Sequence, residues 1–288
     1  MQFSGDISTE SRGIYTFQAT WWFADLGFLN LNMFKKIIET MIRNKLDHSV
    51  ISSFLFYYKR VKCPNASLAQ KYRIIETIIK FLYSLDGNFM SIRGLFDILQ
   101  VSLTLKMNKC SMEKLEQLIG SQLDRAKLDD LLIPSPAGEK IAYNVNLILR
   151  LLDIFLSNSR EKLLMYQLKK VAELIDLYIM EVAPDPCLKP SKFLALAKAM
   201  TDIARESYDT IYFAMDMYLK VHINGLCEEE KITICSVLNY DKLSEEILKD
   251  LTQNESFPAC ALATPQVTLQ NRTRELGHKD FNFFLNIW

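Results

Sequence analysis

Apolar residues recur every three or four positions through most of this chain, with polar residues between them. The segments 31–42 and 162–182 show this spacing most clearly. A period near 3.6 residues places such positions on one face of a helix, and that face must be buried. The pattern therefore predicts an all-α fold, a multi-helix domain of stacked αα-hairpins with one or two helical subdomains.

Polar and helix-breaking residues set the limits of the predicted helices. Asn30 is expected to cap the first helix, and Asp47 or Ser49, Ser111 and Ser244 stand at the starts of later ones. The segment 134–142, with two prolines, a serine and a glycine, is the candidate hinge. No unit of the chain repeats at a fixed period with shared residues. Further helices are predicted over 68–85, 91–105, 144–157 and 162–182, the last with Leu164 and Leu168 on its inward stripe.

The stretch 183–222 combines three prolines with two apolar-periodic segments. Pro184, Pro186 and Pro190 stiffen a loop, and a helix is predicted from about Ser191. A second helix is predicted from about Tyr208. Because both helices carry an apolar face, they are expected to form a hairpin whose faces are buried together.

Composition limits the classes of protein and of site that the chain can belong to. Its 34 basic and 34 acidic residues balance, so a basic nucleic-acid surface is not indicated for the chain as a whole. The polar start carries no apolar run of signal-peptide type, and the apolar segments are too short for a membrane span. Six scattered cysteines without a C-x-x-C pair, and only three histidines, favour reduced thiols in the cytoplasm and no zinc site.

The sequence offers no motif for catalysis, and no catalytic, cofactor-binding or metal-binding residues are predicted. Glycine-rich phosphate loops and the nucleophile elbow of hydrolases are missing. His222 precedes Cys227 by a short loop, a proximity expected by chance. The pair Asp129-Asp130 is followed by apolar residues rather than a further acid, so it is better explained as a charged helix end than as a magnesium site.

Four blocks of the chain resemble one family. They are the Trp-Trp and Asp-Leu pairs at 21–26, the Gln-Leu-Asp to Leu-Leu-Ile-Pro block at 122–134, the segment 183–222 and the Lys-Leu-Ser to Gln-Asn-Glu block at 242–258. In this order they resemble the plant non-phototropic-hypocotyl-three (NPH-three) domain family, close to its divergent BTB/POZ-domain-containing branch. The resemblance implies a helical domain over 17–274. The polar segment 1–16 is expected to be disordered, and the hydrophobic tail 275–288 diverges from the family.

The resemblance also implies a function without catalysis. Family members are adaptors in light and auxin signalling, and they belong to the protein ubiquitination pathway. Their BTB/POZ domain docks a cullin scaffold of type three, and the helical domain faces a receptor or client protein. Neither the BTB/POZ domain nor the C-terminal coiled coil of the family is found in this sequence. We therefore expect protein partners, BTB-containing relatives among them, and no direct cullin binding.

Two other functions stay open at this stage. One is a helical enzyme with a pocket that no motif reveals. The other is a membrane-peripheral signalling scaffold at the plasma membrane, although no polybasic cluster beside an amphipathic helix supports it.

Two small sets of residues are candidates for contact with a partner protein. The first is Asp185, Leu188 and Lys189, because the prolines around them lower the entropy cost of presenting a loop. The second is Trp21 and Trp22, since tryptophan is common at binding hot spots. For both sets the structural alternative is favoured: a proline turn that aims the next helix, and two core tryptophans.

Overall fold

The computed structural model describes residues 22–26, 28–158 and 164–259, together with residues 261, 265 and 268. This part of the chain is helical and contains no strand; its one β-bridge joins Pro134 to Tyr143. The all-α prediction is therefore confirmed. The chain divides into two compact units, Met1–Ala126 and Lys127–Trp288, so the candidate hinge 134–142 lies inside the second unit. The predictions for 1–16 and 275–288 lie outside the described residues.

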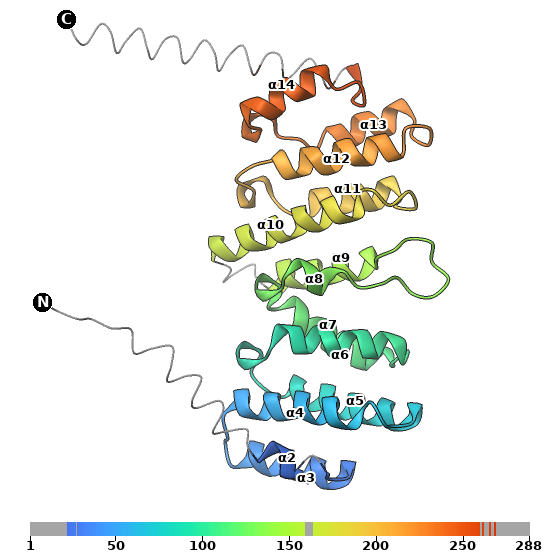
Figure 1. The fold of residues 1–288 in the computed structure, drawn as a ribbon. Helices are drawn as coiled ribbons and strands as arrows, with labels where there is room; N and C mark the ends of the chain where they lie inside the picture. The colour runs from blue at the N-terminus through green and yellow to red at the C-terminus, as the bar shows by residue number, and fades with distance from the viewer. Residues whose placement is uncertain are drawn as a thin grey trace, which may run out of the picture. The chain divides into compact units, whose positions relative to one another are not determined.

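The first unit is built of helix pairs in successive layers, drawn in blue to green in Figure 1. Helices α4 and α5 both contact α3 on one side, and α5 contacts α6 and α7 on the other. The predicted helices bury most of their apolar positions; Val61, in the last turn of α4, was expected to be inward and is 39% exposed. The elements are α2 (Phe23–Leu26), α3 (Leu31–Arg43), α4 (His48–Lys62), α5 (Leu68–Tyr83), η1 (Gly87–Phe89), α6 (Ile92–Thr104), α7 (Lys109–Gly120) and η2 (Leu123–Arg125).

Side-chain caps explain where these helices begin. Asn30 accepts a hydrogen bond from the backbone N–H of Met33, and Asp47 caps α4 in the same way, as predicted. The predicted start of α7 at Ser111 is wrong. Asn108 lies three residues earlier and accepts from the N–H of Ser111, so the helix begins at Lys109.

The second unit is organised around α10, which contacts α8, α11, α12 and η3. It is the longest helix described, with 18 residues. The predicted inward stripe of α10 is correct from Val171 onward but wrong at Leu164, which precedes the first turn and is 58% exposed. The elements are α8 (Leu128–Leu131), α9 (Val145–Asn158), α10 (Met165–Val182), α11 (Pro190–Ala199), η3 (Asp202–Ala204), α12 (Asp209–Val221), α13 (Glu228–Cys235), η4 (Tyr240–Lys242) and α14 (Glu245–Gln253).

The same aromatic contact holds together one hairpin in each unit. In the hairpin α3–α4, the fourth residue of the first helix, Phe34, stacks on Tyr58 with ring centroids 3.6 Å apart. The hydroxyl of Tyr58 donates to the carbonyl oxygen of Leu29, two residues before α3, at 3.0 Å. We call this arrangement of a leucine carbonyl, a phenylalanine and a tyrosine the tyrosine clamp.

The hairpin α11–α12 contains the second tyrosine clamp. Phe193, again the fourth residue of its helix, stacks on Tyr218 at 4.3 Å, and the Tyr218 hydroxyl donates to the carbonyl oxygen of Leu188 at 2.9 Å. Leu188 again lies two residues before the helix. The two hairpins thus have the same arrangement of contacts, although the sequence shows no repeat of fixed period.

A buried ion pair fixes α10 to the segment that follows η3. The Nε of Arg205 donates to both carboxylate oxygens of Asp176, at 3.0 and 3.1 Å, and Nη1 donates to the carbonyl oxygen of Met200. Both side chains are almost fully buried. Burial raises the pKa of the Asp176 carboxyl, and the hydrogen bonds from Arg205 oppose that shift. The pair is therefore sensitive to the loss of either partner.

Truncating the clamp phenylalanine tests the packing of the second unit. Phe193→Ala removes a fully buried ring and should lower the free energy of unfolding by about 3–5 kcal/mol. Phe213→Ala is the matched control, because Phe213 lies on α12 and is 47% exposed; it should cost under about 1 kcal/mol. Chemical denaturation measures both. Equal losses for the two variants would contradict the assignment of inner and outer faces.

Two ion pairs that link α10 to the segment after η3 allow a second test. Arg205→Ala leaves the Asp176 carboxylate buried without its partner, so we expect a loss of about 3–5 kcal/mol in unfolding free energy. Lys169→Ala breaks the exposed pair with Glu206, and we expect no measurable change. Replacing both members of the buried pair, as Arg205→Met with Asp176→Leu, should cost much less than Arg205→Ala. If the double variant lost as much unfolding free energy as Arg205→Ala, the unpaired buried charge would not be the cause of the loss.

Candidate interaction groove

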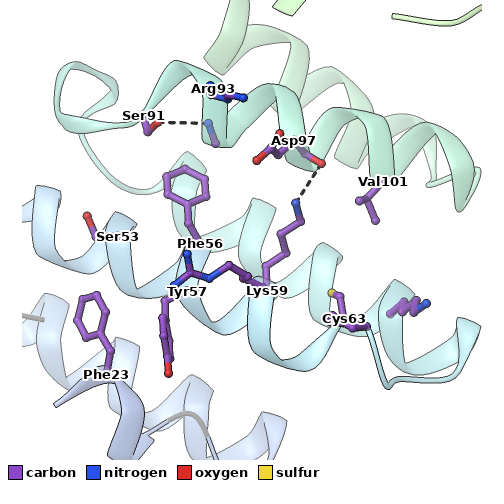
Figure 2. Close-up of a pocket in the computed structure, with 14 residues that line it drawn as sticks. Phe23, Ser53, Phe56, Tyr57, Lys59, Cys63, Ser91, Arg93, Asp97 and Val101 are labelled. Carbon is purple, nitrogen blue, oxygen red and sulfur yellow. Dashed lines mark hydrogen bonds between the residues drawn. The ribbon is translucent and has the colours of Figure 1, made fainter. Parts of the chain in front are cut away.

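An open groove of about 870 Å³ runs between α4 and α6 of the first unit. Figure 2 shows its lining side chains, which come from both helices, from Phe23 of α2, from Pro64 after α4 and from Lys71 of α5. The groove is accessible along its length, because Ser53, Arg60, Arg93 and Asp97 are all exposed. It lies wholly within one unit.

Close approach of α6 to an aromatic ring shapes the groove floor. Phe56 of α4 points toward α6 in Figure 2, and a Cβ placed on Gly94 would lie 2.9 Å from two carbons of its ring. That distance is shorter than van der Waals contact allows, so only glycine leaves the ring in place. Tyr57 points the other way, toward Phe23, with ring centroids 5.6 Å apart. The floor is therefore apolar and aromatic.

The rim of the groove is basic. Its charged side chains are those of Lys59, Arg60, Lys71 and Arg93 against a single carboxylate, Asp97. The amine of Lys59 donates to the backbone carbonyl of Asp97 at 3.3 Å, and the Arg60 guanidinium lies over the Tyr57 ring at 5.5 Å. Within the part of the chain that the structure describes, these four basic residues form no ion pair with a carboxylate. The groove thus has excess positive charge beside an apolar surface.

The one thiol in the groove is that of Cys63, at the C-terminal end of α4. Burial raises the pKa of this thiol, and the charges of Lys59 and Lys71 oppose the shift. A buried thiol whose pKa is raised is a poor nucleophile. Cys63 therefore contributes packing to the groove rather than a reactive group.

The predicted tryptophan contact lies beside this groove. Trp22 is half-buried and packs edge-on against Phe23 at 4.7 Å, and both rings contact Phe54. Phe23 in turn lines the groove. Trp22 is therefore mainly a packing residue that supports one end of the groove, while Trp21 lies outside the described residues.

The predicted contact loop of the second unit is internally braced. One carboxylate oxygen of Asp185 accepts from the N–H of Ala142 at 2.7 Å, and the other accepts from the N–H of Cys187 at 2.8 Å. Leu188 is 1% exposed, and its carbonyl belongs to the second tyrosine clamp. Lys189 alone of the three predicted residues is exposed. The structure therefore brings Asp185 and Leu188 together as parts of a brace.

Asp130 accepts a hydrogen bond from the N–H of Lys127 at 3.0 Å and so acts as a helix-start residue. Among the described residues, no three histidine, cysteine, aspartate or glutamate side chains gather as metal ligands would. Every helix in the same residues is too short or too polar to cross a bilayer.

Sequence reasoning did not find the groove. One signal was present, the run of basic residues in the last turn of α4, Lys59, Arg60 and Lys62. A basic last turn is also what any helix favours, because it complements the helix dipole. The place of Arg93 and Gly94 in the groove becomes visible only when α6 is seen to lie against α4.

A double-mutant cycle tests the contact that shapes the groove. With Phe56 present, the methyl group of Gly94→Ala must displace the ring, so the substitution should be neutral or destabilising. In a Phe56→Ala background the same change meets no ring and should stabilise the protein by up to about 1 kcal/mol through helix propensity. We expect a coupling energy of about 1 kcal/mol or more from chemical denaturation of the four proteins. Strict additivity would show that Phe56 does not lie against Gly94.

Comparison with known proteins gives the family of the chain. The model of the NPH3 family matches residues 20–247. The BTB/POZ domain-containing protein At3g22104 of Arabidopsis thaliana is 46% identical over 252 residues, covering 88% of this chain and 49% of that protein. At1g50280 and At5g03250, two further BTB/POZ domain-containing proteins of this plant, are 32% and 33% identical over 279 and 287 residues. Those matches cover 90% and 88% of this chain.

The chain spans about half the length of these relatives, 51% of At1g50280 and 48% of At5g03250. No solved structure matches it. The groove, the tyrosine clamps and the braced loop all fall inside the segment that the family model matches. With more than half of its residues matched by that model, the chain belongs to the NPH3 family.

Proposed function

We propose that this chain is a noncatalytic protein-interaction module, the receptor- or client-facing part of an adaptor for a ubiquitin ligase with a cullin scaffold of type three. Its relatives carry BTB/POZ domains by name, and this chain corresponds to about half of each. In such adaptors the BTB/POZ domain holds the cullin, and the remaining helical domain is free to hold another protein. This chain supplies the second role.

The basic, aromatic groove between α4 and α6 is the observation that carries the proposal. Its side chains offer charge and apolar area but no hydrogen-bonded pair of nucleophile and base, the arrangement on which covalent catalysis depends. Aromatic and arginine side chains together are the residues most enriched at protein-binding hot spots. The groove therefore suits recognition better than chemistry.

A second and smaller candidate surface is the loop 183–191. Lys189 is exposed there, and Asp185 fixes the loop conformation through its two hydrogen bonds. A loop held in one conformation loses little entropy on binding. Trp22 is half-buried and packs on Phe23, which lines the groove, so it is a candidate contact at that end of the groove.

Cullin binding by two proteins tests the proposed division of roles. One is the purified chain; the other is the same chain with the BTB/POZ domain of a relative fused before Met1. At concentrations of about 10 µM the unfused chain should show no binding to a type-three cullin, whereas the fusion should bind. Isothermal calorimetry measures both.

The BTB/POZ domain alone is the matched control and should bind the cullin as the fusion does. Tight cullin binding by the unfused chain would refute the proposed division of roles. A fusion that fails to bind, while the isolated BTB/POZ domain binds, would show that this chain does not act as the second half of such an adaptor.

A further inference from the structure

The two tyrosine-clamp hairpins have similar clamp faces, but they differ on the face that lies toward the following helices. When Tyr58 of α4 is matched with Tyr218 of α12, the buried Ile51 matches the buried Ile211. In the same register Ser52 matches Tyr212, and Phe56 matches Asp216. Ser52 and Phe56 of α4 therefore occupy the surface that Tyr212 and Asp216 occupy on α12.

In the second unit this surface is closed by side chains. The Tyr212 hydroxyl donates to the carboxylate of Asp250 on α14, and the amide of Asn254 donates to the Tyr212 oxygen at 3.0 Å and to Asp216 at 2.8 Å. The ring of Phe257 stacks on Tyr212 at 5.4 Å. Side chains of the unit itself thus satisfy the polar groups on this face of α12.

In the first unit the equivalent surface stays open. The Ser52 hydroxyl donates to backbone carbonyl oxygens, those of Ser49 at 3.0 Å and Phe89 at 3.3 Å. Phe56 lies on Gly94, and beyond it the groove exposes both aromatic surface and basic groups. The four basic residues of the rim have no carboxylate partner among the described residues, in contrast to Lys220 on α12, which pairs with Asp216 at 2.6 Å.

We propose that the groove binds an acidic segment of a partner protein, with an aromatic or large apolar side chain of that segment on Phe56 and Tyr57. This deepens the proposed function, on which it rests, by naming the chemistry of the partner. The guanidinium groups of Arg60 and Arg93 would each face a carboxylate, a pairing that their geometry favours. The one carboxylate in the groove, that of Asp97, would repel an acidic residue of the segment at that point.

An acidic peptide fits the groove better than a nucleic acid does. The whole chain has no excess of basic residues, and the basic cluster spans one groove rather than a long stripe. The aromatic floor lies between two helices, where a side chain can insert but a duplex cannot lie. The basic rim favours a segment rich in carboxylates, and the apolar floor favours one large apolar side chain within it.

Fluorescence anisotropy with a synthetic probe tests this inference on the full chain. The probe is a labelled peptide of glutamates on both sides of a single phenylalanine. Matched peptides replace the glutamates by lysines or the phenylalanine by alanine. The acidic phenylalanine peptide should bind, and both replacements should weaken binding about tenfold or more. Raising the salt concentration from about 50 mM to about 500 mM should also weaken it, since it screens exposed charges.

Variants place the binding in the groove. Lys71→Glu with Arg93→Glu should weaken the peptide affinity about tenfold or more, because two attractive charges become repulsive. Lys36→Glu on α3, exposed and outside the groove, should change it less than about twofold. Circular dichroism and thermal melting of each variant verify that it is folded. Phe56→Ala should reduce binding of the phenylalanine peptide but not alter that of the alanine peptide.

Four results would overturn the inference. They are no peptide binding at about 1 mM, equal effects of the groove and control variants, a single-stranded oligonucleotide that binds more tightly and loses its affinity with the same variants, or concentration-dependent self-association that the groove variants abolish. The last two would assign the groove to nucleic acid or to a second copy of this chain. If the BTB/POZ fusion still binds cullin in these cases, the proposed function stands and only the partner chemistry is wrong.

Discussion

The tyrosine clamp is the interaction on which the two hairpins that carry it depend. A buried phenol stacks on the phenylalanine of the neighbouring helix and donates to a carbonyl oxygen just before that helix begins. This one side chain therefore sets the distance between the two helices and the path by which the chain enters the first. Burial raises the pKa of Tyr58 to about 12 and also raises that of Tyr218, so both stay neutral donors over the physiological range. Without the hydroxyl, a carbonyl near the core would lose its partner, which is costly.

The clamp fixes one face of each hairpin, and the face toward the next helices differs between the two hairpins. In the second unit Tyr212, Asn254 and Phe257 close that face, so it contributes to stability. In the first unit Gly94 lets Phe56 rest against α6, and the remaining surface is a groove whose four basic side chains form no ion pair within the part of the chain that the structure describes. In the first unit, the residues that maintain the hairpin are thus separate from those that line the groove.

Much of the fold could be predicted because helix periodicity and capping are local properties of the sequence. The buried face of α12 and the caps Asn30, Asp47 and Ser244 follow from spacing and residue type alone. The errors at Ser111 and Leu164 are boundary errors, where a neighbouring residue was the better cap or the helix had not yet begun. The groove could not be predicted, since it is formed by two helices that are separate in sequence and by a glycine whose role depends on the ring opposite. The repeated clamp was missed for a similar reason: what repeats is a set of contacts among three residues rather than a run of shared residues.

Hydrogen–deuterium exchange of the whole chain, with and without a saturating amount of the acidic phenylalanine peptide, tests most directly the claim that this groove is the partner-binding surface. The account predicts slower amide exchange in segments 53–63 and 91–101, and unchanged exchange in 183–191 and 209–221. Protection confined to the second unit would contradict it, because the braced loop or the closed face of α12 would then be the surface that binds.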